Sequence, residues 1–207
     1  MSEMDMQKGL MLVVSGPAGS GKGTVDAILL ERGDFAFSVS ATTRAPRPGE
    51  VDGINYHYIT REEFLSRIDS GDMLEYTEYC GNFYGTPLKE AEEVLRSGKN
   101  LILEIEVEGA RNVKAKYPDA VLVLLLPPSY SEQEVRLRGR GTETEEKILE
   151  RLARAKEEVA FADCYDYVVY NYDGKANEAA EQILSIVTAE KLSIKRNKDV
   201  AKKYLNA

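Results

Sequence analysis

The residues best suited to chemistry lie in a glycine-rich segment near the beginning of the chain, SGPAGSGKGT at positions 15–24. Its spacing is GxxxxGK, with Gly16, Gly21 and Lys22 at the fixed positions. Glycines allow backbone N–H groups to surround phosphate oxygens, and the lysine adds a full positive charge. An apolar run precedes the segment and a helical pattern follows it, as a phosphate loop requires. We predict a nucleoside triphosphate site formed by Gly16, Pro17, Ala18, Gly19, Ser20, Gly21, Lys22, Gly23 and Thr24.

The residue after Lys22 affects how a metal is bound. Phosphate loops of this type usually carry Ser or Thr there as a magnesium ligand, whereas this chain has Gly23 and then Thr24. We expect Mg²⁺ as the cofactor, bound together with the triphosphate. Two ways of holding the metal stay open: Thr24 binds it, directly or through water, or phosphate oxygens hold it mainly.

A second set of cationic and polar residues lies in the stretch SATTRAPRPGEVDGINYHYI at 40–59. Arg44 and Arg47 are three apart in a loop with two prolines, so both can face one phosphate. Arginine suits phosphate because it forms paired, planar contacts. Tyr56 and, further on, Tyr84 add hydroxyl donors. Each arginine alone is more typical of a solvated surface charge, but the group indicates a phosphate-bearing second substrate.

Two carboxylates interrupt an apolar segment at 101–107, LILEIEV. If this segment is one strand, Glu104 and Glu106 share a face and the apolar residues occupy the other. Acids in an apolar strand are costly unless they serve a site or meet cations. We therefore expect both side chains either to serve a site or to meet cations.

Arginines also cluster in the last third of the chain. Arg136, Arg138 and Arg140 precede a helical segment that carries Arg151 and Arg154. They are consistent with a mobile lid that brings cations onto the triphosphate, or with a solvated pair of helices. A capping box of Thr142 and Glu145 is expected to begin the second helix.

The elements that position these groups alternate along the chain. Strands are expected at 10–15, 35–40, 73–79, 101–107, 121–126 and 166–170, and helices at 22–32, 109–116, 131–138, 142–162 and 176–191. A capping box of Thr60 and Glu63 begins a further helix, CGNFYG at 80–85 is expected to be a turn, and Pro87 begins another helix. Alternating strands and helices predict an α/β fold with a parallel sheet covered by helices on both faces.

The whole chain of 207 residues is expected to form one domain. Its core comprises 8–40, 98–128 and 160–190, with an inserted lobe at 41–97, a lid at 129–159 and a basic C-terminal helix or tail at 191–207. The net charge of −8 argues against a general nucleic-acid binder. No apolar run is long enough to cross a bilayer and the first residues lack a signal peptide's apolar core, so we expect a cytoplasmic protein without a membrane partner.

The stretch at 40–59 resembles the signature of the guanylate kinase family. The resemblance continues through GDMLEYTEYCGNFYGTP, LILEIEVEGA and RLRGRGTETEEKILERLARA, and spans roughly Leu10 to Ile186. It implies a P-loop parallel sheet core with a GMP-binding lobe and a mobile lid. It also implies transfer of the γ-phosphoryl group from MgATP to GMP, and to dGMP, in purine nucleotide metabolism and GMP recycling.

The resemblance also implies roles for individual residues. For GMP binding it indicates Ser40, Arg44, Arg47, Tyr56, Glu75, Tyr84, Thr86, Glu104 and Glu106. For catalysis it indicates Lys22, Arg47, Arg140 and Arg151, and for ATP binding it adds Asn171. Glu104 and Glu106 stand where the family often has Asp, and Tyr172 stands where Asp commonly follows the asparagine.

Two alternatives remain. One is a P-loop kinase for AMP, CMP or another small acceptor, against which Glu75 and Glu106 argue. The other is a non-catalytic guanylate-kinase-like module that binds phosphopeptides, against which the intact phosphate loop argues. The sequence leaves the choice between monomer and homodimer open.

Overall fold

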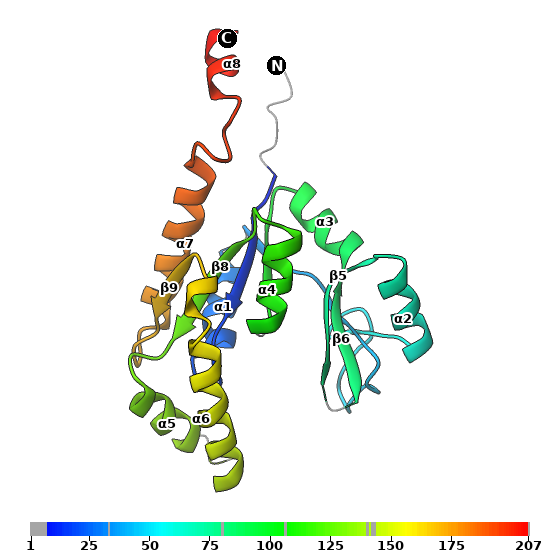
Figure 1. The fold of residues 1–207 in the computed structure, drawn as a ribbon, viewed down its shortest axis with the longest axis vertical. Coiled ribbons are helices and arrows are strands. Elements are labelled where there is room, and N and C mark those ends of the chain that lie inside the picture. Colours follow the sequence, from blue (N-terminus) through cyan, green and yellow to red (C-terminus); the bar gives the residue numbers. More distant parts are fainter. Residues whose placement is uncertain are drawn as a thin grey trace.

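The computed structural model describes residues 8–32, 34–79, 81–105, 107–139, 141 and 144–206. A five-stranded sheet in the order β2-β7-β1-β8-β9 lies at its centre, and all neighbouring strands are parallel (Figure 1). Its strands are β1 (Met11–Ser15), β2 (Phe35–Phe37), β7 (Asn100–Glu104), β8 (Val121–Leu126) and β9 (Tyr167–Tyr170). The α/β class predicted from the sequence is confirmed.

Helices cover both faces of this sheet, which is why β1 and β8 consist of continuous apolar runs. On one face, α1 (Lys22–Glu31) and α7 (Ala176–Leu192) pack through residues such as Leu29 and Ile183. On the other face, α3 (Leu88–Arg96) and α4 (Val107–Lys116) pack through Leu95 and Val113. Among the described residues, no helix has the length and hydropathy needed to cross a membrane.

A second, four-stranded sheet in the order β4-β3-β6-β5 is inserted between β2 and β7. Its strands are β3 (Ala41–Thr42), β4 (His57–Tyr58), β5 (Met73–Tyr79) and β6 (Asn82–Pro87). Helix α2 (Arg61–Asp69) packs on this sheet, with the Phe64 ring stacked on that of Phe83 at 5.2 Å between centroids. The predicted cap is present, because Thr60 Oγ1 accepts a hydrogen bond from the Glu63 N–H at 3.1 Å.

The turn expected at 80–85 is wrong for most of its length. Residues from Asn82 onward belong to β6, which pairs with both β5 and β3. The reversal is confined to the vicinity of Gly81, whose φ of 76° suits a residue without a side chain. Residues 83–87 are mostly buried, so pairing and packing outweigh the turn propensity of Asn and Gly.

Two helices form a hairpin after β8. They are α5 (Tyr130–Gly139) and α6 (Glu145–Val159), and they bury Leu137, Ile148 and Leu152 together. Figure 1 shows this hairpin and the inserted lobe extending from the same end of the core. A short 3-10 turn, η1 (Ala162–Cys164), leads into β9, and α8 (Val200–Leu205) ends the chain.

Two predicted boundaries are wrong. The N-cap of α6 is Thr144, whose side chain accepts a hydrogen bond from the Lys147 N–H. The predicted N-cap, Thr142, lies outside the described residues. Strand β7 ends at Glu104, and Val107 already begins α4. Val107, Ala110 and Val113 are three apart and all buried, so the apolar face that they form fits a helix better than a strand.

Candidate active site

The phosphate loop connects the carboxyl end of β1 to α1. Gly21 is the N-cap of α1 in the left-handed conformation, with φ 88° and ψ 23°. The Lys22 ammonium donates to the Gly16 carbonyl at 2.6 Å. The loop therefore wraps around the lysine at the positive end of a helix dipole, as a phosphate site requires.

Side chains from distant parts of the chain support this loop through hydrogen bonds to its backbone carbonyls. Asn171, directly after β9, donates from Nδ2 to the Ser20 carbonyl at 2.9 Å, and Gln133 of α5 donates from Nε2 to the Ala18 carbonyl at 2.8 Å. Both braces are buried. The carbonyls of Ala18 and Ser20 are thus satisfied on the protein side, and the two bonds hold the loop in its conformation.

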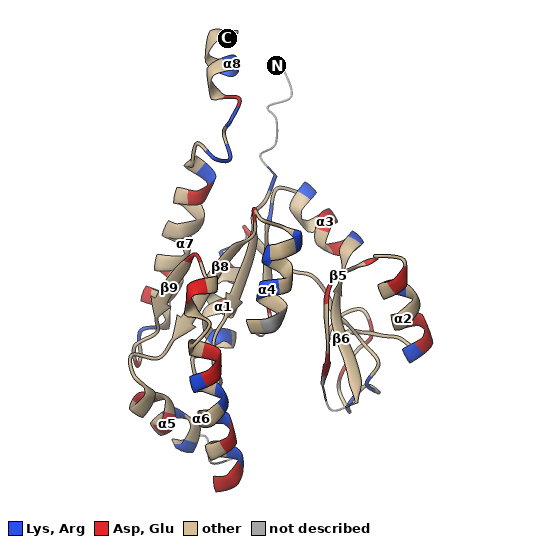
Figure 2. Cartoon of the chain, viewed as in Figure 1, with Lys and Arg blue, Asp and Glu red and all other residues tan. Residues whose placement is uncertain are grey.

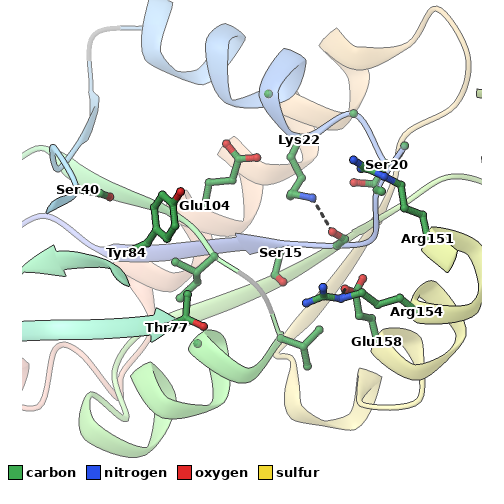
Figure 3. Close-up of a pocket in the computed structure, with 18 of the residues that line it drawn as sticks. Ser15, Ser20, Lys22, Ser40, Thr77, Tyr84, Glu104, Arg151, Arg154 and Glu158 are labelled. Carbon is green, nitrogen blue, oxygen red and sulfur yellow. Dashed lines mark hydrogen bonds and ion pairs between the residues drawn. The ribbon is translucent and has the colours of Figure 1, made fainter. Parts of the chain in front are cut away.

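A cavity of about 740 Å³ opens in front of the loop. Four parts of the fold line it: the phosphate loop, the inserted lobe, the segment from the end of β7 into α4, and helix α6. Figure 3 shows Arg151 and Arg154 of α6 near Lys22 and Ser20, with Ser40, Thr77 and Tyr84 across the cavity. The predicted site residues on its wall are Gly16, Ala18, Gly19, Ser20, Gly21, Lys22, Gly23, Thr24, Ser40, Tyr56, Glu75, Tyr84, Glu104 and Arg151.

Glu75 is a buried carboxylate that reaches this cavity from β5. Its side chain is 7% exposed, and Thr86 donates to its Oε1 at 2.7 Å from the neighbouring strand β6. Burial raises the pKa of Glu75, and hydrogen bonds from Thr86 oppose that effect. Thr86 is not among the residues that line the cavity. Its hydroxyl instead supports Glu75 and fixes the orientation of the carboxylate.

The arginine loop of the lobe is held together by Glu50. Arg44 Nη2 contacts Glu50 Oε1 at 2.9 Å, and the guanidinium lies 5.6 Å from the centroid of the Tyr56 ring. The Arg47 N–H donates to Glu50 Oε2 at 2.7 Å, and the Tyr58 hydroxyl donates to the same oxygen at 2.8 Å. The pKa of Glu50 is lowered to about 2, first by the Arg47 N–H and then by Tyr58 and Arg44, against the effect of burial.

Arg44 and Arg47 differ in exposure. The side chain of Arg44 is 14% exposed, between Glu50 and two tyrosine rings. Arg47 is exposed, and neither arginine is among the residues that line the cavity. Tyr56 and Tyr84, whose rings meet edge to face at 6.0 Å between centroids, line the cavity, and Arg44 lies against the Tyr56 ring.

The arginines of α5 and α6 fall into two groups. Arg151 and Arg154 line the cavity, and Arg154 also contacts Glu158 at 3.1 Å. Arg138 instead pairs with Glu134 and Glu145, and Arg136 donates to the Asn171 carbonyl at 2.8 Å. Arg136 and Arg138 therefore stabilise the helices and the loop after β9. Arg140 and Glu106, both predicted for the site, lie outside the described residues.

Two carboxylates lie close to Lys22. Glu104, at the end of β7, is exposed and lines the cavity, and Figure 3 shows it between Tyr84 and Lys22. Asp26, one turn after Lys22 on α1, is 1% exposed, and neither of its oxygens has a hydrogen-bond partner among the described residues. The pKa of Asp26 is raised to about 7, first by burial and then by the charge of Glu104, while the charge of Lys22 opposes the shift.

The donor set near Lys22 fits magnesium bound with a nucleotide. The described residues contain no cluster of three or more His, Cys, Asp or Glu side chains that could hold a metal alone. Mg²⁺ commonly takes one or two protein oxygens and completes its shell with phosphate oxygens and water. The Glu104 carboxylate and the exposed Thr24 hydroxyl are such oxygens on the wall beside the phosphate loop.

Several residues of the site were missing from the sequence prediction. Thr77 could have been found, because it is two positions after Glu75 on β5 and so shares its face. The sequence pattern places Arg154 on the same helical segment as Arg151 but gives it no place in the site. Gln133, Asp26 and Glu50 carry no local signal, since their roles depend on contacts between segments far apart or on burial.

The fold and the cavity define a P-loop phosphotransferase with a separate lobe for an acceptor. The family model for guanylate kinase matches residues 8–190. The chain is 50% identical to a guanylate kinase of Halalkalibacterium halodurans over 90% of this chain and 91% of that protein. It is 49% identical to one of Shouchella clausii over 97% and 96% of the two chains. The crystal structure of guanylate kinase from Anaplasma phagocytophilum superposes with a TM-score of 0.70 at 34% identity, covering 92% of this chain and 90% of that one. The chain belongs to the guanylate kinase family.

Proposed function

We propose that the protein is an ATP:GMP phosphotransferase, which converts GMP, and also dGMP, to the diphosphate in purine nucleotide metabolism and GMP recycling. The observation that carries this proposal is a single cavity shared by a phosphate loop and a buried lobe carboxylate, Glu75. A donor triphosphate and an acceptor base can therefore be held in one space.

The donor half binds the triphosphate of ATP. Lys22 and the loop N–H groups surround the β- and γ-phosphates, and Asn171 and Gln133 hold the loop in shape. Asn171 has this supporting role in addition to its predicted place near ATP. Glu104 and Thr24 would hold Mg²⁺, which neutralises phosphate charge when bound.

The acceptor half distinguishes the base of the nucleotide. Guanine presents N1–H and N2–H₂ donors on one edge, and a carboxylate such as Glu75 accepts both, whereas adenine presents an acceptor at N1. A buried site built for donors discriminates strongly because the wrong base leaves polar groups unpaired. Arg44, Arg47, Tyr56 and Tyr84 bind the GMP phosphate. Ser40 also binds GMP, and Glu106 completes the guanine contacts.

The reaction needs no covalent intermediate. An oxygen of the GMP phosphate attacks the γ-phosphorus of ATP in line, the bond to the β-γ bridging oxygen breaks, and GDP and ADP result. The acceptor is already an anion, so no general base is required. Lys22, Arg47, Arg140 and Arg151 position the phosphates and stabilise the charge in the transition state.

The experiment is a coupled ADP-release assay with ATP and, in turn, GMP, dGMP, AMP and CMP. GMP is expected to give the highest kcat/KM, and a Lys22→Ala variant is expected to lose nearly all activity. Lys89→Ala, at an exposed lysine of α3, is the matched control and retains activity. Faster turnover of AMP or CMP would refute the base assignment. ATP binding without use of any monophosphate would favour the phosphopeptide-binding module.

The cytoplasmic location and the choice between monomer and homodimer stay predictions. The expected absence of nucleic-acid and membrane partners stays a prediction as well.

A further inference from the structure

Strand β5 presents an open hydroxyl group to the cavity. Thr77 lines the cavity and is exposed, and no hydrogen bond joins its hydroxyl to another described residue. The other threonines of the inserted lobe all have hydrogen-bond partners within the chain, namely Thr42, Thr43, Thr60 and Thr86. A hydroxyl can donate one hydrogen bond and accept others, so the Thr77 hydroxyl is available to a bound molecule.

The strand register places this hydroxyl beside residues already assigned to the acceptor. Thr77 follows Glu75 by two positions on β5, so the two side chains share a face and lie about 7 Å apart along the strand. Thr77 is paired directly with Tyr84 of β6, as Glu75 is with Thr86. Figure 3 shows Thr77 next to Tyr84 on the wall across the cavity from Lys22. The Thr77 side chain is short, so its hydroxyl stays close to the strand, beyond the carboxylate of Glu75.

Charge indicates which part of a nucleotide this hydroxyl meets. Strands β5 and β6 contain no Lys or Arg, and their charged residues are Glu75 and Glu78 (Figure 2). Arg44 and Arg47 lie instead on the connection between β3 and β4. A phosphate placed beside the Glu75 carboxylate would be repelled by it. Thr77 therefore faces an uncharged part of the acceptor, which is either the base or the sugar.

The shape of a nucleotide favours the sugar. The inference rests on the proposed function, in which Glu75 accepts hydrogen bonds from N1–H and N2–H₂ of guanine. The sugar is attached on the opposite side of the base, and its 2′-hydroxyl lies on the flank that carries N2, about the width of a purine from the edge that Glu75 contacts. Thr77, two positions beyond Glu75, lies at a matching distance along β5. Both hydroxyls can donate and accept, and the 2′-hydroxyl is the group that distinguishes ribose from deoxyribose.

We propose that the Thr77 hydroxyl forms a hydrogen bond with the 2′-hydroxyl of the acceptor nucleotide and gives the enzyme a preference for GMP over dGMP. Thr77 is a specificity-determining residue and not a catalytic one, because the sugar takes no part in phosphoryl transfer. The bond forms when GMP binds and persists in the transition state, so it lowers the KM for GMP and leaves kcat unchanged.

The test compares kcat/KM for GMP and dGMP in the wild-type chain and in Thr77→Val. Valine has the shape and the strand preference of threonine but no hydroxyl, so the lobe keeps its fold. The ratio of kcat/KM for GMP to that for dGMP is expected to fall by about 3- to 10-fold, the effect of one hydrogen bond between neutral groups, through a higher KM for GMP. Thr77→Ser keeps the hydroxyl and is expected to retain the ratio. Thr188→Val, at an exposed threonine of α7, is the matched control and leaves the ratio unchanged.

A third substrate, 3′-deoxy-GMP, identifies the sugar hydroxyl. It retains the 2′-hydroxyl, so Thr77→Val is expected to lower kcat/KM for 3′-deoxy-GMP as much as for GMP. A loss for GMP and dGMP but not for 3′-deoxy-GMP would assign Thr77 to the 3′-hydroxyl and overturn the proposal. Equal losses for all three substrates would place Thr77 against the base or the phosphate and overturn it too.

The same measurements separate this inference from the proposed function. If the wild-type chain phosphorylates GMP and Thr77→Val leaves the ratio of GMP to dGMP unchanged, the assignment of Thr77 alone is wrong. If the wild-type chain phosphorylates neither GMP nor dGMP, the proposed function is wrong, and the assignment of Thr77 is refuted with it.

Discussion

Replacement of Gly21 by alanine tests how tightly the phosphate loop is braced. Gly21 has φ 88°, and a Cβ built on it would lie 2.3 Å from Asn171 Nδ2. This atom donates to the Ser20 carbonyl at 2.9 Å and is buried, so it cannot move aside without breaking that bond. The left-handed conformation costs alanine about 1–2 kcal/mol, and loss of a buried hydrogen bond costs about 1–3 kcal/mol. We expect Gly21→Ala to lower the free energy of unfolding by about 2–5 kcal/mol.

A double-mutant cycle separates the two contributions. In an Asn171→Ala background the close contact and the hydrogen bond are already gone, so Gly21→Ala should cost only the conformational term of about 1–2 kcal/mol. The difference, a coupling energy of about 1–3 kcal/mol, is measured by urea unfolding without nucleotide. Gly23→Ala is the matched control, because a Cβ there meets nothing within 4 Å and its position is helical. This control should be neutral or more stable by about 0.5–1 kcal/mol.

The same cycle has a functional readout. Because Asn171 and Gly21 shape the loop N–H groups, Gly21→Ala is expected to raise the KM for ATP far more than the KM for GMP. Coupling below about 0.3–0.5 kcal/mol would mean that the two sites are independent. In that case Asn171 does not brace the loop, and the structural reasoning for the donor half is refuted.

The remaining predictions concern the lobe, the lid and pH. Glu75→Gln should lower kcat/KM for GMP by about 10²–10⁴-fold relative to AMP. Thr86→Val removes the hydroxyl that orients Glu75 and should lower the same ratio by about 10-fold. Equal losses for GMP and AMP would contradict the assignment of Glu75 to the base. Arg151→Ala should lower kcat by about 10²–10³-fold. Arg138 is engaged in ion pairs away from the cavity, so Arg138→Ala should change kcat by less than about 5-fold. A larger effect of Arg138→Ala than of Arg151→Ala would show that Arg151 does not stabilise the transition state. Because the pKa of Glu50 is lowered from 4.5 to about 2, its stabilisation is complete above pH 4.5 and is lost as the pH falls toward 2. Acid unfolding followed by circular dichroism should show this loss, and Glu50→Gln should abolish it; an unchanged acid profile would show that the arginine loop does not depend on Glu50.

The donor half of the site could be predicted from the sequence because it is a local structure. The conformation of the loop at 15–24 depends mainly on its own glycines and on the strand and helix that flank it. The supports of the loop were unpredictable, because Gln133 is 115 residues from the carbonyl that it contacts. Such contacts follow from the packing of α5 and the end of β9 around the loop, which short-range patterns do not encode.

The expected strand at 101–107 shows how a pattern can mislead. Leu103, Ile105 and Val107 alternate with acids, as in a half-buried strand, but Val107 also begins the series of buried residues on α4. The helix prevails because α4 covers the same face of the sheet as α3, and β7 therefore ends at Glu104. The consequence for function is that Glu104 lies at the carboxyl end of a strand, beside the phosphate loop, where parallel sheets bind ligands.

The two halves of the site are held in different ways. The phosphate loop is fixed by buried hydrogen bonds from α5 and from the residue after β9, so little of it has to be reorganised when ATP binds. Arg44, in contrast, is held by Glu50, so a GMP phosphate bound as proposed would meet a guanidinium that is already engaged. Because Glu50 also binds the Arg47 N–H and the Tyr58 hydroxyl, that phosphate would have to add to this network rather than replace it. In the proposed complex Glu50 would lower the net positive charge near the acceptor phosphate while it fixes the shape of the loop, and the choice of substrate would rest on shape and on Glu75.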